Sequence, residues 1–178
     1  MIKVRLNRQV GKDVKKLYKS AFPKPERVSW FSLKLGAKRN VTSLWAYLDG
    51  DTFCGFTHAY STDKMALLLY FAVNESERSK GYGSQILQML KEEYKGKTII
   101  INVEPLDENA QNFAQRKRRL AFYNKNGFFD TGYLVEDVGG LYTALSNTDN
   151  FNPQEYKDLY MALTKNRWNP EVVKNSTL

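Results

Sequence analysis

A segment at residues 78–84 combines cations with glycines and could bind phosphate through its backbone. It lies between an apolar run at residues 65–73 and a helical pattern that begins near residue 82. The first N–H groups of a helix lack partners within the helix and lie at the positive end of its dipole, and glycine lets a phosphate approach them. The alternative is that the glycines only shape a tight turn. The segment consists of Arg78, Ser79, Lys80, Gly81, Tyr82, Gly83 and Ser84.

This segment does not fit the two best-known nucleotide motifs. A P-loop needs a lysine followed by serine or threonine after its second glycine, whereas Ser84 directly follows Gly83 here. A dinucleotide-binding fold needs a third glycine where this chain has Ile86. We therefore expect neither an ATP-binding nor an NAD-binding motif.

A second patterned segment, Phe-Tyr-Asn-Lys-Asn-Gly-Phe, occupies residues 122–128. With it, the sequence resembles the GNAT superfamily of N-acetyltransferases. Residues 78–83 match the family's Arg/Gln-x-x-Gly-x-Gly/Ala motif, and residues 123–128 match its Tyr-x-x-x-Gly-Phe motif. The order of the expected elements agrees with the family from residue 1 to about residue 145.

The resemblance implies an enzyme that transfers the acetyl group of acetyl-CoA to a primary amine by direct attack, without a metal. It implies a mixed, mostly antiparallel sheet flanked by helices, with the fourth and fifth strands splayed apart. The backbone amides of residues 78–84 would hold the pyrophosphate of acetyl-CoA. The pantetheine arm and thioester would lie along residues 101–104 and Phe71, Ala72 and Val73, with a backbone N–H near Ala72 or Val73 as oxyanion donor.

Tyr123 is the expected general acid. A phenol with an ordinary pKa of about 10 is protonated at neutral pH and can donate its proton to the departing thiolate. The resemblance gives this role to the tyrosine at this motif position. The alternative is an aromatic residue of the core or its rim, since the chain has 11 tyrosines.

The general base is harder to identify. In part of the family a glutamate on the fourth strand serves, but residues 65–73 contain no acid. Glu104 is the first candidate because the neighbouring strand should deliver it to the cleft, with water as a relay. Glu75 and Glu136 are alternatives. His58, the only histidine, has a suitable ordinary pKa near 6.5, although a lone histidine in a strand is more often packed or exposed.

Cysteine and histidine usage argues against metal and thiol chemistry. One histidine and one cysteine cannot form the usual zinc sites. Cys54 lies in an apolar strand pattern, where we expect an inert thiol rather than a nucleophile.

The sequence departs from the family before the motif tyrosine. Many members have an asparagine seven residues before it, where this chain has Arg116. Asn109 or Asn112 would substitute as the cofactor-contacting amide. The cations of residues 116–119 either face a phosphate of CoA or form a solvated helix face.

The acceptor site has little chemical signature. Its aromatic candidates, given by the family's architecture, are equally consistent with core positions. The acidic segment at residues 104–108 favours a cationic acceptor. The aromatic candidates are Trp30, Phe31, Trp45 and Tyr142.

The chain is basic, with 27 Lys and Arg against 19 Asp and Glu, and carries a net charge of +8. This favours anionic partners, either nucleic acid or a phosphorylated cofactor. The cations lack the repeats and Gly-rich low complexity of RNA-binding arms. The alternative functions are a nucleic-acid or ribosome-associated binding module, and a catalytically silent CoA-binding sensor.

Length and composition predict a single domain. The 178 residues, 42% of them hydrophobic, suit one N-acetyltransferase domain at 1–178, with 146–178 a C-terminal extension containing a helix. The longest apolar run, at residues 65–73, is far shorter than the roughly 20 residues of a membrane span. Without a signal-like N-terminus or paired cysteines, we expect a cytoplasmic protein, either a monomer or a homodimer.

Hydrophobic spacing predicts the order of the first elements. A strand at residues 2–6 precedes a helix that ends before Pro23, and a second helix carries Val28, Phe31 and Leu35 on one face and ends at Gly36. A hairpin turning at residues 49–51 follows.

The remaining pattern predicts a crossover and a final hairpin. The buried strand at residues 65–73 should be central, and a helix from residue 82 should end at Gly96. A strand at residues 98–104 precedes a helix over residues 107–126, with Asp107 and Glu108 near its start. Two strands then occupy residues 128–146, and Pro153 opens a terminal helix.

Overall fold

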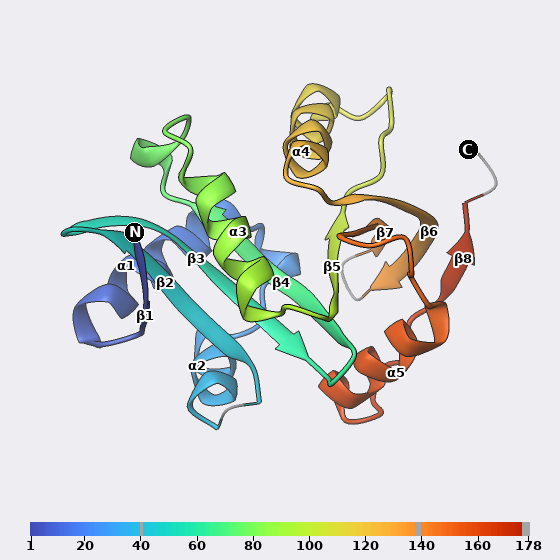
Figure 1. The fold of residues 1–178 in the computed structure, drawn as a ribbon, viewed down its shortest axis with the longest axis horizontal. Coiled ribbons are helices and arrows are strands. Elements are labelled where there is room, and N and C mark those ends of the chain that lie inside the picture. The colour runs from blue at the N-terminus through green and yellow to red at the C-terminus, as the bar shows by residue number, and fades with distance from the viewer. Residues whose placement is uncertain (40, 138–139, 176–178) are drawn as a thin grey trace. The chain divides into compact units, whose positions relative to one another are not determined.

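The protein, described by a computed structural model at residues 1–39, 41–137 and 140–175, forms two compact units (Figure 1). The first unit contains residues 1–60 and 68–93, and the second contains residues 61–67 and those from 94 onward. The elements through residue 93 are β1 (Ile2–Arg5), α1 (Arg8–Ala21), η1 (Lys24–Glu26), α2 (Trp30–Lys38), β2 (Ser43–Asp49), β3 (Thr52–Ser61), β4 (Met65–Val73), η2 (Glu75–Glu77) and α3 (Tyr82–Glu93). They are followed by β5 (Thr98–Val103), α4 (Phe113–Lys125), β6 (Phe129–Asp137), β7 (Gly140–Ser146), α5 (Pro153–Thr164) and β8 (Val172–Lys174).

Strands are mostly antiparallel in both units. The first unit has the order β1-β2-β3-β4, and the second has the start of β4 followed by β5, β7, β6 and β8. The pairs β1–β2, β2–β3, β5–β7, β6–β7 and β6–β8 are all antiparallel. The predicted mixed α/β class with a mostly antiparallel sheet is confirmed.

Helix α1 begins and ends where the sequence predicts. The side-chain oxygen of Asn7 accepts hydrogen bonds from the N–H groups of Gln9 and Val10, both at 2.9 Å, and so caps the first turn. The helix ends at Ala21, because the backbone before Pro23 is extended. Its apolar side packs with α2 and the sheet in one buried cluster.

The sheet of the first unit is covered on both faces. Leu44 and Ala46 of β2 pack in the cluster that contains α1 and α2 residues. Tyr47, the next residue along β2, packs instead with Ile86 of α3. Because successive strand residues point to opposite faces, α1 and α2 cover one face and α3 covers the other.

A β-bulge between β2 and β3 changes which face β3 presents. The register shifts between Tyr47, which pairs with Gly55, and Leu48, which pairs with Phe53, so Cys54 has no partner. Cys54 therefore packs toward α3, although Phe56, two residues further along, packs toward α1.

The C-terminal residues complete the second unit. Helix α5 begins at Pro153, as predicted, and buries Tyr156, Leu159 and Tyr160. The Tyr156 hydroxyl accepts a hydrogen bond of 2.7 Å from Asn102 of β5. Strand β8, which the sequence pattern does not reveal, pairs with β6 at the outer edge.

Two predicted helix boundaries are wrong. Helix α2 continues past Gly36 to Lys38, and its buried residue is Leu33, whereas Phe31 is 73% exposed. Helix α4 begins at Phe113 rather than near residue 107, because Asp107 accepts the Asn109 N–H through its side chain and the Ala110 N–H through its carbonyl. Such local bonds favour turns over helix.

Among the described residues, no helix has both the length and the apolar composition that a membrane crossing requires.

Candidate active site

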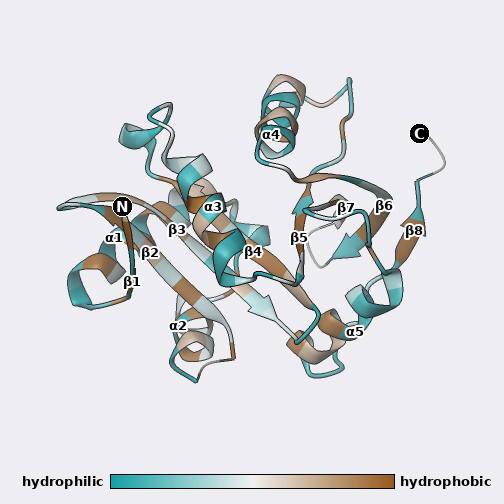
Figure 2. Cartoon of the chain, viewed as in Figure 1, coloured by the Kyte–Doolittle hydropathy of each residue, from teal (hydrophilic) through white to brown (hydrophobic). Residues whose placement is uncertain are grey.

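The loop at residues 78–84 lies in the first unit and leads from η2 into α3. Ser79 and Gly81 have positive φ angles of 64° and 86°, which turn the backbone before the helix begins. A Cβ at Gly81 would meet no atom within 4 Å, so open space lies beside the turn. The residues from η2 to the start of α3 are predominantly hydrophilic (Figure 2).

Backbone N–H groups in this loop are available to a ligand. The N–H groups of Ser84 and Gln85 donate to the Gly81 carbonyl at 3.1 and 3.2 Å. Before them, the N–H groups of residues 79–83 make no hydrogen bond with any described residue. This row of donors precedes the positive end of a helix of three turns, an arrangement that favours an anion.

The two cations of the loop contact nearby acids. Arg78 lies 3.4 Å from Glu75, and Lys80 lies 3.0 Å from Glu77. Both cationic side chains are more than half exposed. The Arg78–Glu75 pair is exposed on both sides and contributes little to stability, so Arg78 can turn toward an anionic ligand at small cost. The Glu77 side chain that holds Lys80 is only 13% exposed.

Tyr82 fixes the start of α3 to the hairpin turn. Its hydroxyl donates a hydrogen bond of 2.8 Å to Asp49. This bond, with lesser contributions from desolvation and from the Asp49 charge, raises the pKa of Tyr82 to about 12. The tyrosine therefore positions the loop and stays protonated.

The end of β4 is held close to β3. A side chain at Gly55 would collide with the carbonyl oxygen of Ala72 and lie 3.2 Å from the Cα of Val73. The Asn74 N–H donates to the Cys54 carbonyl at 2.8 Å. Phe71 and Val73 pack toward α3, whereas Ala72 packs toward α1.

Tyr123 lies on α4 in the second unit and is only 7% exposed. Its ring packs edge-on against Phe122 and Phe128, at centroid distances of 5.4 and 6.4 Å. Burial raises the pKa of Tyr123 to about 12, and the Arg119 charge opposes that rise. With this raised pKa, its hydroxyl keeps its proton at neutral pH.

Glu104, Asn112, Arg116 and Arg119 form a bonded group that we call the Glu104 cluster. Arg119 donates to one carboxylate oxygen of Glu104 at 2.8 Å, and Arg116 lies 3.0 Å from the other. The Asn112 amide donates to Glu104 at 3.1 Å and accepts from Arg116 at 2.8 Å. Arg116 also donates to the Pro105 carbonyl at 2.8 Å, so the cluster ties the end of β5 to α4.

These contacts bear on the expected roles of Glu104 and Asn112. Partial burial tends to raise the pKa of Glu104, but the hydrogen bond from Asn112 and the charges of Arg119 and Arg116 prevail and lower it. A carboxylate with a lowered pKa is a weaker base. The Asn112 amide is bonded at both ends within the protein. The spacing of Asn112, Arg116 and Arg119 on one side of α4 is the sequence signal for this cluster.

The other candidate bases differ from Glu104 in their surroundings. His58 is 4% exposed, and desolvation lowers its pKa to about 3, so it is neutral at physiological pH. Glu75 is ion-paired with Arg78, and Glu136 lies exposed on β6. Cys54 is buried, and desolvation raises the pKa of its thiol, which makes it a poor nucleophile.

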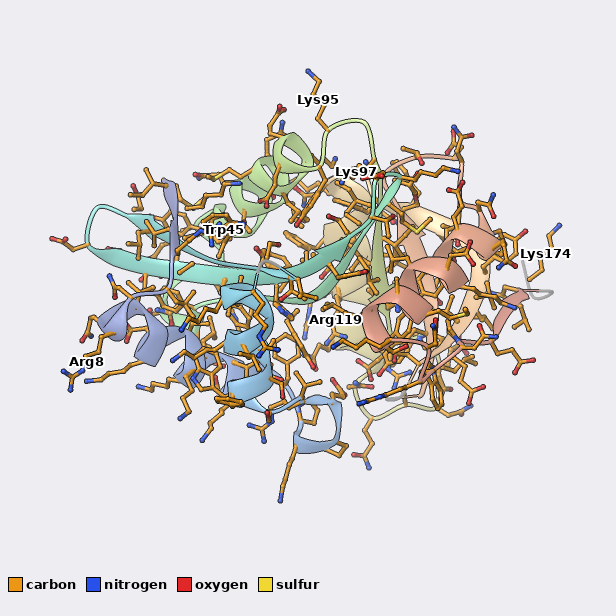
Figure 3. All side chains as sticks on the ribbon, turned by 90° about the horizontal axis from the view of Figure 1, so that it is seen from below. Arg8, Trp45, Lys95, Lys97, Arg119 and Lys174 are labelled. Atoms are coloured by element: carbon orange, nitrogen blue, oxygen red, sulfur yellow. The ribbon has the colours of Figure 1, made fainter. Side chains whose placement is uncertain are left out.

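The aromatic acceptor candidates differ in their surroundings. Trp45, labelled in Figure 3, donates to Glu93 at 2.9 Å and lies 4.9 Å from the ammonium of Lys3. Trp30 packs against the cluster of α1 and α2. Phe31 is left largely exposed, and Tyr142 lies half-buried on β7.

Comparison with protein families matches residues 11–128 to the model of the acetyltransferase (GNAT) family. The matched range contains both the loop at residues 78–84 and Tyr123. A search of curated proteins finds no match.

Several solved structures share the fold. A putative acetyltransferase of the GNAT family from Bacteroides thetaiotaomicron is 24% identical, with a TM-score of 0.70 over 93% of this chain and 95% of that one. An aminoglycoside 6′-N-acetyltransferase complexed with coenzyme A is 18% identical, with a TM-score of 0.63 over 86% and 99%. A chimeric spermidine N-acetyltransferase from Vibrio cholerae SpeG and hSSAT is 14% identical, with a TM-score of 0.63 over 84% and 97%.

Proposed function

The chain belongs to the acetyltransferase (GNAT) family of enzymes, and on this premise we propose that it acetylates a primary amine of a small molecule or protein, using acetyl-CoA. The observation that carries this proposal is the row of unbonded backbone N–H groups at residues 79–83, before α3. Such donors suit a diphosphate, and the coenzyme carries one.

The residues of the loop fit this group. Gly81 leaves open space where a side chain would stand, and the side chains of Arg78 and Lys80 are both more than half exposed. The loop, residues 78–84, would hold the diphosphate, and Phe71, Ala72 and Val73 would line the arm that follows it. Asn112 is bonded within the Glu104 cluster, and contact with the coenzyme would require it to exchange one of those bonds.

Bound acetyl-CoA supplies an acetyl group activated as a thioester. The amine nitrogen attacks the acetyl carbon, an amide bond forms and the carbon–sulfur bond breaks. Tyr123 gives its hydroxyl proton to the departing sulfur and later regains a proton from solvent. A backbone N–H near Ala72 or Val73 donates to the oxyanion.

We assign the proton lost by the amine to solvent water rather than to Glu104. The two arginines and Asn112 stabilise the ionised carboxylate of Glu104, so it gains little by accepting a proton. Attack then depends on the neutral fraction of the amine, and turnover should rise with pH toward the pKa of the acceptor.

An amine acceptor is also supported by the names of structurally similar proteins. One acts on aminoglycosides and another on spermidine, and both acceptors are amines. For this chain, the acidic segment at residues 104–108 adds two exposed carboxylates, Asp107 and Glu108, beyond the Glu104 cluster. These favour a cationic acceptor.

The test is a screen of amines, including polyamines, aminoglycosides and lysine peptides, that measures thiol release from acetyl-CoA. We expect acceptor-dependent release with at least one class. Tyr123→Phe should lower turnover by about 10²- to 10⁴-fold with little change in CoA affinity. Tyr133→Phe removes a phenol from β6 of the same unit and should leave turnover unchanged.

Three outcomes would contradict the proposal. CoA binding without release for any acceptor would indicate a silent sensor, and salt-sensitive RNA binding without CoA binding would indicate a nucleic-acid module. Normal turnover of Tyr123→Phe would remove Tyr123 from the mechanism.

A further inference from the structure

We infer that Arg119 is a positioning residue for proton donation by Tyr123: Glu104 anchors its guanidinium, which places a fixed positive charge one helical turn from the phenol. The inference rests on the proposed function, because it concerns the acid of that reaction. By this inference, the Glu104 cluster supports proton donation in addition to joining the end of β5 to α4.

Helix geometry brings Arg119 and Tyr123 together. Both lie on α4, four residues apart, and side chains at this spacing are neighbours on one helix face. Tyr123 is buried, and the Arg119 side chain is 36% exposed. The neighbouring cations Lys117 and Arg118 are both exposed, so they point away from the helix face that carries Arg119 and Tyr123.

Glu104 fixes the arginine without cancelling the charge of the cluster. The 2.8 Å bond from Arg119 Nη1 to Glu104 Oε2 holds the guanidinium in place. Arg116 binds the other oxygen of the same carboxylate, so two cations face one anion. The cluster as a whole therefore keeps one unit of net positive charge.

Proton donation needs this charge. When the phenol O–H bond breaks and an S–H bond forms on the leaving thiolate, Tyr123 becomes a phenolate in a buried position. Burial opposes that anion, and a nearby cation stabilises it. Phe122 and Phe128, which pack against the ring, carry no charge, and Arg119 is the charged side chain that acts on Tyr123 among the described residues.

The first test measures the phenol directly. 3-Fluorotyrosine placed at position 123 brings the phenol pKa into an accessible range, and fluorine NMR follows its ionisation with pH. Arg119→Gln should raise this pKa by about one unit, a tenfold weaker acid, and Arg119→Lys should restore most of the loss. Arg118→Gln, which removes an exposed cation one residue away, should leave it unchanged.

The second test measures turnover with the unlabelled enzyme. Arg119→Gln should lower kcat about tenfold, with an unchanged KM for acetyl-CoA, and Arg119→Lys should recover most of it. An equal phenol pKa in Arg119→Gln and Arg118→Gln, with both variants folded, would overturn the inference. Failure of the proposed function would be distinct: no amine would then release thiol from acetyl-CoA with the natural protein, whatever the NMR titration shows.

Discussion

At the scale of single residues, burial keeps several titratable groups neutral. Desolvation raises the pKa values of Tyr123 and Cys54 and lowers that of His58. Each group therefore holds its neutral form near pH 7. For Tyr123, the positive charge of Arg119 opposes the effect of burial on the pKa.

His58 should make stability depend on pH. Its ring stacks on Tyr70 at 5.9 Å, and Nε2 lies 3.0 Å from the Thr42 hydroxyl, while Nδ1 has no partner among the described residues. Because its folded pKa of about 3 lies below the ordinary 6.5, its contribution is full above pH 6.5 and is lost as pH falls toward 3. Lowering the pH from 7 to 5 should therefore reduce the free energy of unfolding by about 2 kcal/mol through His58 alone.

Urea unfolding at the two pH values measures this contribution. His58→Phe keeps an aromatic ring and removes the titrating group, so its free energy of unfolding should change less between pH 7 and pH 5 than that of the natural protein. Equal changes in the two proteins would contradict the assignment of a depressed pKa to His58.

Residue patterns located the candidate residues better than they predicted the contacts of those residues. Tyr123 follows from its motif, and the structure places it on α4, buried against Phe122 and Phe128. The pairing of Glu104 with two arginines depends on where α4 begins, and the sequence pattern misplaces that start by several residues because the turn at Asp107 competes with helix. The contacts of a charged side chain depend on the tertiary structure, which the spacing of residues along the sequence does not specify.

At the scale of elements, two glycines shape the turn before α3 and the contact between β3 and the end of β4. Gly81 permits the positive φ before α3, and Gly55 permits the close contact of β3 with the end of β4. The two positions differ physically, since Gly81 faces open space and Gly55 faces backbone. They therefore give separable predictions.

Gly81 should be needed for coenzyme affinity. Gly81→Ala introduces backbone strain of about 1–2 kcal/mol, and Gly81→Asp adds a negative charge that should weaken acetyl-CoA binding by about 10- to 100-fold. Gly96, after α3, has nearly the same φ, 84° against 86°, and equally open surroundings. Gly96→Asp should therefore lose as much stability as Gly81→Asp in urea unfolding. Isothermal titration of Gly96→Asp with acetyl-CoA should nevertheless show normal affinity. Normal affinity in Gly81→Asp would remove the loop from the binding site.

Gly55 should be needed for the packing of β3 on β4. A Cβ there meets the Ala72 carbonyl and the Val73 backbone, which cannot rotate aside, so Gly55→Ala should destabilise the protein by about 1–3 kcal/mol. Gly11 lies in α1 with no atom closer than 4.0 Å, so Gly11→Ala should stabilise by about 0.5–1 kcal/mol. Chemical denaturation compares the two, and a neutral Gly55→Ala would show that the strands separate freely.

Periodicity located most elements because their apolar faces are continuous. Strand β4 and helix α5 follow the predicted ranges, and helix α3 begins at Tyr82 as predicted but ends at Glu93, before Gly96. The pattern fails at α2, because Val28 and Phe31 have the spacing of a buried helix face but are exposed. It also fails at β8, which at three residues is too short to show a period. Short edge elements gain their stability from pairing rather than from their own sequence.

At the scale of the whole molecule, the positive charge is concentrated near the N-terminus. Within residues 1–39, Asp13 and Glu26 are the only acids among many lysines and arginines. Arg8, at the start of α1, extends away from the ribbon in Figure 3. A field of this sign attracts anionic ligands and is screened by salt.

Acetyl-CoA should raise the thermal midpoint of the whole chain. Binding at 100 times Kd stabilises a protein by about 2.7 kcal/mol, and salt should weaken the effect by screening the diphosphate. Scanning fluorimetry at low millimolar coenzyme measures the shift, which added RNA should not change. A shift abolished by RNA would indicate that a polyanion competes for the same surface.

Strand β8 has a consequence for handling the protein. It pairs with Tyr133, Leu134 and Val135 and so covers the outer edge of β6 along those residues. A chain shortened before Val172 would leave unpaired N–H and C=O groups along a strand that also carries apolar side chains, which is the usual template for chains to associate with one another. Shortened versions should accordingly precipitate at concentrations where the full chain stays dispersed.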